Sequence, residues 1–408
     1  MLENSSAKTW HTEGAARFCI GDAFFRSSSQ TGRDLAVLAA IAQRNHPANP
    51  EKTLRILDAM TGCGVRPLRY VLEAGADFVW ANEGNWELRD RLQSNLSASL
   101  PRDRYCLTHR DANALFFDCY QRQDFYDLID IDSFGSPTPT LSTSLWAIEL
   151  GGLLYLTSTD GRTISGHAPD KSLQIYSAYA RAHPAVHEQG LRLLIGTAVQ
   201  QAAARGLTVY PVFCWYSGEV NRVMVRVTRQ ATWKTEHYGF LGYCHSCGQF
   251  HTVGWKKLGR GLRCSCNAET FPVISGPMWL GPLHNLNDLS AMADVAMVKI
   301  SAGKQSTGSN KHQHYPGQKQ AHPQDMGERW ATCHKLLTLM QAEAHQPPYY
   351  YPLAEIGRRG KMNIPPKATL LSALSQQGYR ATSTHIDPQA IKTDAPFAIC
   401  LQLAKQLS

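Results

Sequence analysis

The chain has 408 residues, of which 43% are hydrophobic and 18% are charged, and its formal net charge is +8. This length predicts about two or three domains of roughly 100–200 residues each. No apolar run reaches the roughly 18–20 residues of a membrane span, and the N-terminus lacks a signal-peptide core, so we expect a cytoplasmic protein without a membrane partner. The positive charge favours an anionic partner.

Short apolar segments alternate with helical segments from about residue 54 to 230, which predicts an α/β fold with a parallel, doubly wound sheet. The predicted strands cover residues 53–60, 77–83, 105–113, 125–132 and 153–160, with an edge strand at 220–229. The predicted helices cover residues 66–75, 85–100, 144–151 and 187–206. We therefore expect one domain over residues 1–240.

The composition changes after residue 240. Residues 241–275 are rich in glycine, cysteine and aromatic side chains and are expected to form a small separate module. Residues 276–408 are expected to form a small α+β domain, because helical runs there precede short mixed segments. Within it, residues 301–326 contain almost no aliphatic side chains, which predicts a mobile loop.

Three successive strand ends carry groups that suit a nucleoside cofactor. Gly62 and Gly64 form a turn after the first strand, where the backbone can approach a ligand closely. Glu83 ends the second strand and can accept hydrogen bonds from two ribose hydroxyls. Asp111 follows the third strand and suits an adenine amino group, with the small Ala112 beside the ring. These three strand ends, taken in order, favour S-adenosylmethionine over NAD as the cofactor. For Gly62 and Gly64 considered alone, the alternative is a tight turn that binds no ligand.

The fourth strand ends in the sequence DIDSFGSP, residues 130–137. An exocyclic amine on an aromatic ring is a poor nucleophile, and a carboxylate with a neighbouring carbonyl can accept its two N–H groups and orient it. Asp132, the carbonyl of Ser133 and the ring of Phe134 suit that task, and we expect Asp132 to be ionised at neutral pH. The alternative is that Asp132 caps the next helix, while Asp130 is expected to be structural.

Four of the 11 cysteines cluster between residues 244 and 266. Cys244 and Cys247 form a C-x-x-C pair, and Cys264 and Cys266 form a C-x-C pair. Two such pairs in a cytosolic chain predict a tetrahedral structural zinc site. Four reduced thiols without a metal are the alternative.

Seven sequence blocks, read together, resemble the tRNA (guanine-26 N2)-dimethyltransferase family over nearly the whole chain. They are ANEGNWE, DANAL, DIDSFGSP, HEQGLRLLIG, GPMWLGPLH, PYYY and GYRATSTHIDPQAIKTDAPF, and they occur in the order of that family. The resemblance implies a Rossmann-like S-adenosylmethionine-dependent methyltransferase domain, a cysteine-bound zinc, and a family-specific C-terminal domain that binds tRNA. The implied reaction transfers one or two methyl groups to N2 of guanine 26, with a neighbouring guanine as a further acceptor.

The resemblance also implies roles for individual residues. It implies cofactor contacts for Arg33, Arg66, Glu83, Asp111 and Ala112. It implies that Asp132 is the catalytic aspartate and that Phe134 lies at the pocket for the target base. The strand-two acid is usually aspartate in that family, whereas Glu83 stands here.

Four further positions depart from the family's pattern. Gly32 stands where the family has asparagine, Arg26 and Ser27 stand where it has asparagine and proline, and Ser133 stands where it has proline. The departures at Arg26, Ser27 and Ser133 keep a second hypothesis open, a non-catalytic RNA-binding or chaperone protein. A methyltransferase of another planar amine is a third hypothesis, which shares the chemistry of the fourth strand but leaves the C-terminal block unexplained. We expect the protein to be a monomer.

Overall fold

A computed structural model describes residues 9–47, 49, 51, 53–229, 234–258, 262–266, 271–306 and 323–408. Its centre is a seven-stranded sheet in the order β5-β4-β3-β6-β7-β9-β8. These strands are β3 (Arg55–Asp58), β4 (Phe78–Asn82), β5 (Tyr105–Thr108), β6 (Tyr126–Asp132), β7 (Ile148–Ser158), β8 (Thr208–Ser217) and β9 (Val220–Thr228). Strands β3 to β7 pair in parallel, and β9 is antiparallel to both β7 and β8. The predicted parallel α/β sheet is confirmed.

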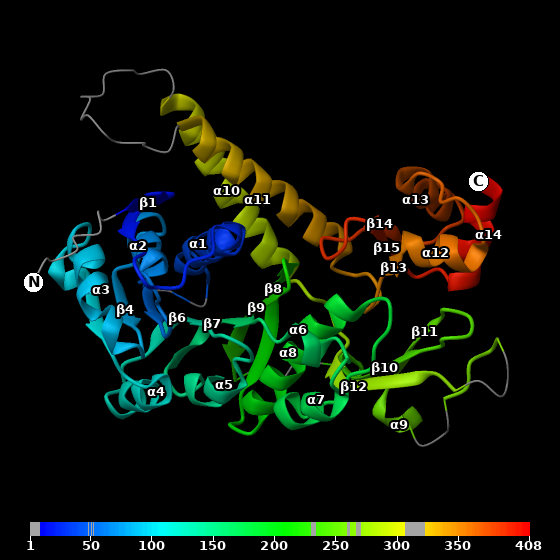
Figure 1. Cartoon of the computed structure of the whole chain (residues 1–408), viewed down its shortest axis with the longest axis horizontal. Coiled ribbons are helices and arrows are strands. Elements are labelled where there is room, and N and C mark those ends of the chain that lie inside the picture. The colour runs from blue at the N-terminus through cyan, green and yellow to red at the C-terminus, as the bar shows by residue number, and fades with distance from the viewer. Residues whose placement is uncertain are drawn as a thin grey trace, which may run out of the picture.

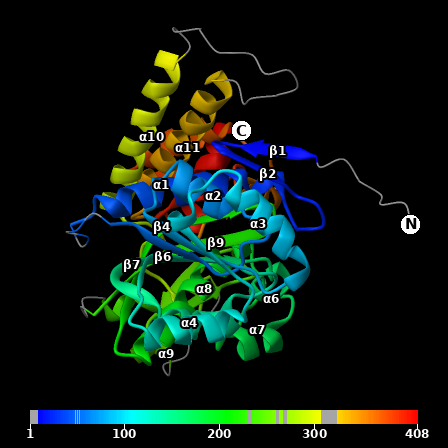
Figure 2. The same ribbon diagram turned by 90° about the vertical axis from the view of Figure 1, so that its left-hand side faces the viewer.

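Helices cover both faces of this sheet (Figures 1 and 2). One face carries α1 (Gln30–Arg44), α2 (Val65–Leu72) and α3 (Arg89–Ser97). The other carries α4 (Ala112–Gln121), α5 (Thr138–Ser144), α6 (Gly161–Ile164), α7 (Pro169–Tyr176) and α8 (Val186–Ala203). Successive strand residues point to opposite faces, so Ile56 packs in the core beside α1 and Leu57 packs in the core beside α4 and α8.

The N-terminal segment forms a hairpin of β1 (Trp10–Glu13) and β2 (Ala16–Cys19). A loop and the 3-10 helix η1 (Ser27–Ser29) connect it to α1. Three further 3-10 helices are η2 (Trp86–Leu88), η3 (Arg102–Arg104) and η4 (Thr235–His237). The hairpin packs on α2 and α3 through Phe18, so the loop that follows it lies next to the glycine turn of β3.

Two small antiparallel sheets follow the central one. The first, in the order β11-β10-β12, contains β10 (Tyr238–Tyr243), β11 (Phe250–Val253) and β12 (Val273–Trp279), with α9 (Trp255–Leu258) beside it. The second, in the order β13-β15-β14, contains β13 (Tyr351–Pro352), β14 (Ala381–Ser383) and β15 (Ala390–Thr393). Helices α12 (Leu353–Gly360), α13 (Lys367–Gln376) and α14 (Phe397–Leu407) pack with it and complete the predicted α+β unit.

A pair of long helices connects these parts. Figure 1 shows α10 (Leu286–Ser306) and α11 (Pro323–Glu343) side by side above the central sheet. Leu289 and Met292 of α10 share a core with Leu35 of α1, so the pair covers the same face as α1. The predicted loop at 301–326 is therefore too long, because both of its ends are helical, and residues 307–322 lie outside the described residues.

Three other predictions of secondary structure are wrong. Residues 148–151 belong to strand β7 rather than to a helix. Ile148 pairs with Tyr126 of β6, and the pairing shifts register before it resumes at Leu153. The strand predicted at 220–229 is not an edge strand, since β9 lies between β7 and β8. The edge strand β8 was not predicted; Pro211 interrupts its pattern, and its pairing shifts register there.

Hydrophobic contacts run across the predicted domain boundaries. A single buried cluster contains Leu154 of the central sheet, Phe250 of the second sheet, and Tyr351 and Phe397 of the C-terminal region. The division at residues 240 and 275 therefore stays a prediction. Within the described part of the chain, we find no helix with the length and apolar character needed to cross a membrane.

Candidate active site

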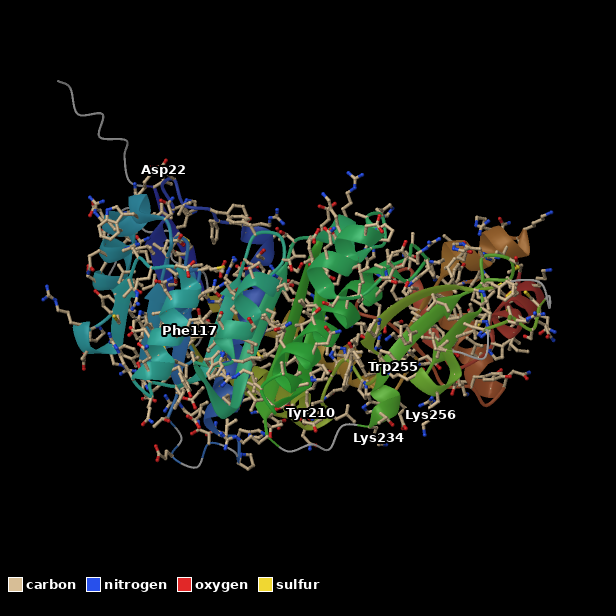
Figure 3. All side chains as sticks on the ribbon, turned by 90° about the horizontal axis from the view of Figure 1, so that it is seen from below. Asp22, Phe117, Tyr210, Lys234, Trp255 and Lys256 are labelled. Atoms are coloured by element: carbon tan, nitrogen blue, oxygen red, sulfur yellow. The ribbon has the colours of Figure 1, made fainter. Side chains whose placement is uncertain are left out.

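The carboxyl ends of the parallel strands open into a cavity of about 490 Å3. Parallel strands end at one edge of a sheet, and this is where α/β folds bind their ligands. The cavity is lined by every residue predicted to bind the cofactor or substrate: Arg33, Arg66, Glu83, Asp111, Ala112, Asp132 and Phe134. No residue of α9 lines it, and Figure 3 shows Trp255 and Lys256 on the side opposite Asp22 of the N-terminal loop.

Arg66 connects the two aspartates that end β6. Its Nη1 lies 2.6 Å from Oδ2 of Asp130, and its Nη2 lies 2.6 Å from Oδ2 of Asp132. The Tyr70 hydroxyl also donates to Asp130, at 2.6 Å. The Asp130 side chain is fully buried, whereas that of Asp132 is 32% exposed toward the cavity. Arg66 thus holds Oδ2 of Asp132, and the other carboxylate oxygen, Oδ1, is available on the cavity side.

Opposing effects act on the pKa of Asp132. Burial raises it, but the charges of Arg66 and Arg222 outweigh burial and lower the pKa below the ordinary value. For Asp130, burial dominates and the pKa is raised despite Arg66. Asp132 is therefore ionised at neutral pH. It does not cap the next helix, because the N-cap residue of α5 is Pro137.

The ends of β4 and β5 supply the groups predicted for a nucleoside. Glu83 accepts hydrogen bonds from the backbone N–H of Gly62 (2.8 Å) and of Asn85 (2.9 Å), which ties the glycine turn to the end of β4. Gly62 has φ +57°, so a glycine is favoured there. Asp111 caps α4 by accepting from the N–H of Ala114 at 3.0 Å. Carboxylates and a close backbone turn line this half of the cavity, which fits a ribose and an adenine.

Arg33 lines the cavity and also binds the N-terminal hairpin and the loop that follows it. Its guanidinium forms a buried ion pair with Glu13 of the N-terminal hairpin and donates to the carbonyl of Arg26 at 3.1 Å. Burial raises the pKa of Glu13, but the hydrogen bond and charge of Arg33 outweigh it and lower the pKa. Arg33 thus holds the N-terminal loop over the cavity. Both arginines predicted to bind the cofactor are paired with carboxylates.

Two exposed aromatic rings lie at the mouth of the cavity. Phe134 is 74% exposed and Phe24 is 57% exposed, and their ring centroids are 4.9 Å apart at an angle of 77°. Single exposed apolar side chains are common, but adjoining ones can mark a binding surface. The pair offers a surface on which a flat base can stack.

Several lining residues were not predicted from the sequence, among them Phe24, Thr157 and Arg222. Phe24 comes from the N-terminal loop, where no periodic pattern gives a position. Thr157 and Arg222 come from β7 and β9, and each pairs directly with its neighbour across the sheet. An arginine inside the apolar run of β9 was the available signal.

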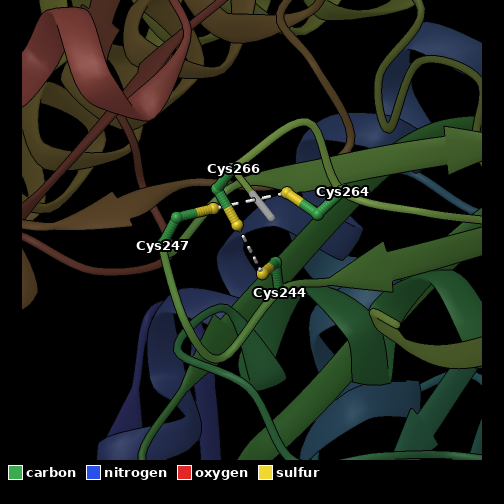
Figure 4. A group of neighbouring side chains, drawn as sticks. All are labelled: Cys244, Cys247, Cys264 and Cys266. Atoms are coloured by element: carbon green, nitrogen blue, oxygen red, sulfur yellow. Dashed lines mark hydrogen bonds between the residues drawn. The ribbon is translucent and has the colours of Figure 1, made fainter. Parts of the chain in front are cut away.

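The four predicted metal ligands come together in space (Figure 4): Cys244 and Cys247 follow β10, and Cys264 and Cys266 lie between α9 and β12. All four Sγ atoms lie within 4.8 Å of one another, with Cys244–Cys266 at 3.7 Å and Cys247–Cys264 at 3.4 Å. Two sulfurs bound to tetrahedral zinc at about 2.3 Å would lie roughly 3.8 Å apart. The cluster is compatible with a structural zinc.

The thiols of the cluster do not share one pKa shift, since burial raises the pKa of Cys247 while that of Cys244 is lowered. Burial raises the pKa of Cys244, but backbone hydrogen bonds from Cys247 and Ser246 outweigh it and lower the pKa to about 7. Thiolates are the form that binds metal. Arg359 of α12 donates to the carbonyls of His245 and Ser246, both at 2.8 Å, and so attaches this loop to the C-terminal region.

Comparison with known proteins gives consistent findings. The family model described as N2,N2-dimethylguanosine tRNA methyltransferase matches residues 11–311 and 316–405. A tRNA (guanine(26)-N(2))-dimethyltransferase of Pyrococcus horikoshii is 30% identical over 370 residues, which cover 86% of each chain. The enzyme of the same name from Thermococcus kodakarensis is 26% identical over 422 residues, covering 97% of this chain and 98% of that one.

A solved structure resembles the whole fold. Trm1 from Pyrococcus horikoshii, determined in complex with S-adenosyl-L-methionine, superimposes with a TM-score of 0.77 and 25% sequence identity. The match covers 97% of this chain and 99% of that one. The likeness thus includes the C-terminal region as well as the central sheet.

Proposed function

The chain belongs to the N2,N2-dimethylguanosine tRNA methyltransferase family, and from that premise we propose that Asp132 holds the exocyclic N2 of the target guanine for methylation. The enzyme is an S-adenosylmethionine-dependent tRNA (guanine-26 N2)-methyltransferase. The observation that carries the role of Asp132 is its ionised, partly exposed carboxylate in the same cavity as Glu83 and Asp111.

The cofactor supplies an electrophilic methyl group. We propose that Glu83 accepts hydrogen bonds from its ribose hydroxyls and that Asp111 accepts one from its adenine amino group. Ala112 is buried and small, which leaves space for the ring. Arg66 orients Asp132 by ion pairing, and Arg33 holds the N-terminal loop by pairing with Glu13. Both arginines also line the cavity, and a direct cofactor contact by either stays a prediction.

Asp132 is suited to orient an amine rather than to remove a proton before reaction. Its Oδ2 is held by Arg66, so Oδ1 is the oxygen available to an N2–H of the guanine. We propose that the carbonyl of Ser133 accepts the second N–H. Two acceptors direct the nitrogen lone pair and stabilise the positive charge that develops there. The proton that leaves N2 then passes to Asp132.

Guanine 26 must leave the base stack to reach this cavity. Enzymes that modify a base inside folded RNA turn the nucleotide out and stack it against aromatic side chains. We propose that Phe134, with Phe24 beside it, receives the guanine ring. The exposed position of both rings supports this assignment.

The C-terminal region is proposed to contact the tRNA backbone. Arg358 and Lys361 are exposed and line a shallow groove at the end of α12. Phosphate contacts by such residues position a nucleic acid without reading its sequence. Arg358→Ala with Lys361→Ala is expected to weaken tRNA binding and reduce its salt dependence, with unchanged affinity for S-adenosylmethionine. Unchanged tRNA binding in that variant would place the contact elsewhere.

Mass spectrometry of nucleosides tests the function. Purified protein, S-adenosylmethionine and an unmodified tRNA transcript are expected to yield N2-methylguanosine and N2,N2-dimethylguanosine. A matched transcript with adenine at position 26 controls for the site and should show a loss of most product. Methylation of a different nucleoside would favour the hypothesis of another planar amine, and absence of product with intact cofactor binding would contradict catalysis.

A further inference from the structure

A row of directly paired residues crosses the sheet at the cavity. Asp132 of β6 pairs with Thr157 of β7, Thr157 pairs with Arg222 of β9, and Arg222 pairs with Trp215 of β8. Directly opposed residues in a sheet point to the same face. That face is the one under α1, since Tyr155, two residues before Thr157, donates to the carbonyl of Gly32 at 3.0 Å.

Arg222 is a buried guanidinium with unused donors. It is 2% exposed and lines the cavity, and its Nη2 donates to the Ser29 hydroxyl at 3.0 Å. The Trp215 ring lies 5.1 Å from the guanidinium carbon. Within the described part of the chain, nothing accepts a hydrogen bond from its Nε, and no carboxylate lies within 4.0 Å.

This environment differs from that of the other buried arginines of the cavity. Arg33 is paired with Glu13, and Arg66 is paired with Asp130 and Asp132. An arginine carries five N–H donors, and leaving one buried and unpaired is unfavourable. The unpaired Nε lies against Gly32 of α1. Because Arg222 also lines the cavity, its terminal guanidinium nitrogens are the donors open to a ligand there.

The order of the strands indicates which ligand that is. The groups suited to the nucleoside are Glu83 and Asp111, at the ends of β4 and β5, on one side of Asp132. Arg222 on β9 lies on the other side of Asp132. If the nucleoside occupies the first side, the base to be methylated extends toward the second.

The hydrogen-bonding edge of guanine fits this row. N2 at one end of the edge donates, and O6 at the other end accepts. With N2 at Asp132, O6 points along the row toward Arg222. We propose that Arg222 reads O6 of the target guanine, as a specificity-determining residue for the reaction; this inference rests on the function proposed above.

Gly32 gives independent support. A Cβ at this position would lie 2.7 Å from Nε of Arg222 and 2.9 Å from the Trp215 ring. A side chain there would displace the guanidinium. The absence of a side chain at Gly32 therefore leaves the room that the Arg222 guanidinium occupies.

A base-specific substitution in the tRNA tests the proposal. 6-Thioguanine at position 26 keeps N1–H and the N2 amine but replaces O6 with sulfur, a weak acceptor. The wild-type enzyme is expected to prefer guanine by about 10- to 100-fold in kcat/KM, since sites built around a hydrogen bond discriminate strongly. Equal rates on the two transcripts would overturn the proposal without any variant.

Variants of the protein test whether Arg222 is the residue that distinguishes guanine from 6-thioguanine. Arg222→Met is expected to lower kcat/KM for guanine by about 100-fold and to bring the preference over 6-thioguanine within about threefold. Gly32→Ala keeps the charge of Arg222 but displaces its guanidinium. It should therefore also reduce the preference for guanine over 6-thioguanine. Circular dichroism and calorimetry with S-adenosylmethionine accompany both, with the cofactor Kd expected to stay within about twofold.

The outcomes separate the two proposals. If Arg222→Met weakens the cofactor by tenfold or more and keeps the preference for guanine, Arg222 binds the cofactor's carboxylate and the proposal is overturned. If the wild-type enzyme makes no N2-methylguanosine on either transcript, the proposed function fails instead. A variant that does not fold leaves the wild-type comparison as the deciding measurement.

Discussion

Two networks of buried charge stabilise this chain, and they differ in what they leave open. In the active-site network, Arg66 pairs with Asp130 and Asp132, and Asp132 keeps an exposed oxygen in the cavity. The second network, here called the closed cluster, joins α8, α11 and the C-terminal sheet. Its members are Glu188, Arg192, His284, Glu343, His385 and Lys392.

The charged side chains of the closed cluster pair with one another, although Glu188 Oε2 accepts no hydrogen bond within the described part of the chain. Lys392 lies 2.7 Å from Glu188 and 3.7 Å from Glu343, and Glu343 also accepts from Thr384 at 2.7 Å. The side chains of its ion pairs are at most 2% exposed. His284, Glu343 and His385 are close enough to hold a metal ion, but Lys392 already supplies positive charge there.

The comparison shows how the closed cluster differs from the active-site network. Ion pairing alone does not mark an active site, because both networks have it. The active-site network differs in that one carboxylate and one guanidinium, Asp132 and Arg222, line a cavity that a ligand can enter, whereas no member of the closed cluster lines that cavity. Substitutions in the two networks should therefore change different measurements.

The largest effect is expected for Asp132→Ala. Removing the acceptor for N2 should lower methyl transfer to tRNA by about 1000-fold, the range for loss of a group that stabilises transition-state charge. Binding of S-adenosylmethionine, followed by calorimetry, should persist. Asp127→Ala is the matched control, because Asp127 lies on the same strand but accepts from the N–H of Arg55 at the opposite edge. Near-normal activity of Asp132→Ala would remove it from the mechanism.

Glu343→Gln tests the closed cluster and should act on stability rather than chemistry. Breaking a buried ion pair from one side costs about 3–5 kcal/mol of unfolding free energy. Urea denaturation measures that loss, while kcat per folded molecule should stay unchanged. Asp394→Asn is the control, since its pair with Arg380 is exposed and worth about 0–1 kcal/mol. Loss of kcat at full stability would mean that the clusters share a function.

These two tests also show where sequence reasoning succeeded. Glu83, Asp111 and Asp132 could be assigned to one cavity because each follows a buried strand, and parallel strands end together. Cys244 to Cys266 could be grouped because their spacing is local. Both inferences rest on sequence positions, the end of a parallel strand or a short spacing between cysteines, that determine where the side chains lie in space.

Sequence reasoning failed where distant segments meet. Arg222 and Phe24 reach the cavity through an antiparallel strand and an N-terminal loop, and no periodicity encodes either placement. The closed cluster joins residues up to 204 positions apart, such as Glu188 and Lys392. The segment 144–151 was predicted as a helix because a short apolar run does not distinguish a buried strand from a helix.

Acid should separate the two networks in the wild-type enzyme. Burial lowers the pKa of His284 well below its ordinary value, and it lowers the pKa of His183 to about 4 although Gln189 opposes this. The unfolded chain binds these protons below about pH 6.5 and the folded chain does not, so stability is lost as pH falls from there toward 4. Thermal melts from pH 8 to 5 measure this decline.

The catalytic step should not follow that decline. The lowered pKa of Asp132 keeps its carboxylate ionised throughout this range, so kcat corrected for folded protein should stay flat from pH 8 to 5. A fall in kcat with a midpoint near pH 6 would contradict the assignment. In Arg66→Gln, burial acts on Asp132 with less opposition, its pKa rises, and kcat should decline as the pH is lowered.

The smallest effect is expected for Ser133→Pro, within the active-site network itself. The loop after β6 is already held to β7, because the Ser133 hydroxyl donates to the carbonyl of Thr157 at 3.2 Å and Gly135 and Thr159 exchange two hydrogen bonds at 2.8 Å. Proline would remove the hydroxyl bond but fix φ, and these effects are each worth about 1 kcal/mol or less. Asp132, the preceding residue, lies in a strand, which is the backbone region that proline requires there. We therefore expect kcat within about threefold of wild type. Loss of activity in a folded variant would show that the loop needs freedom to present its carbonyl.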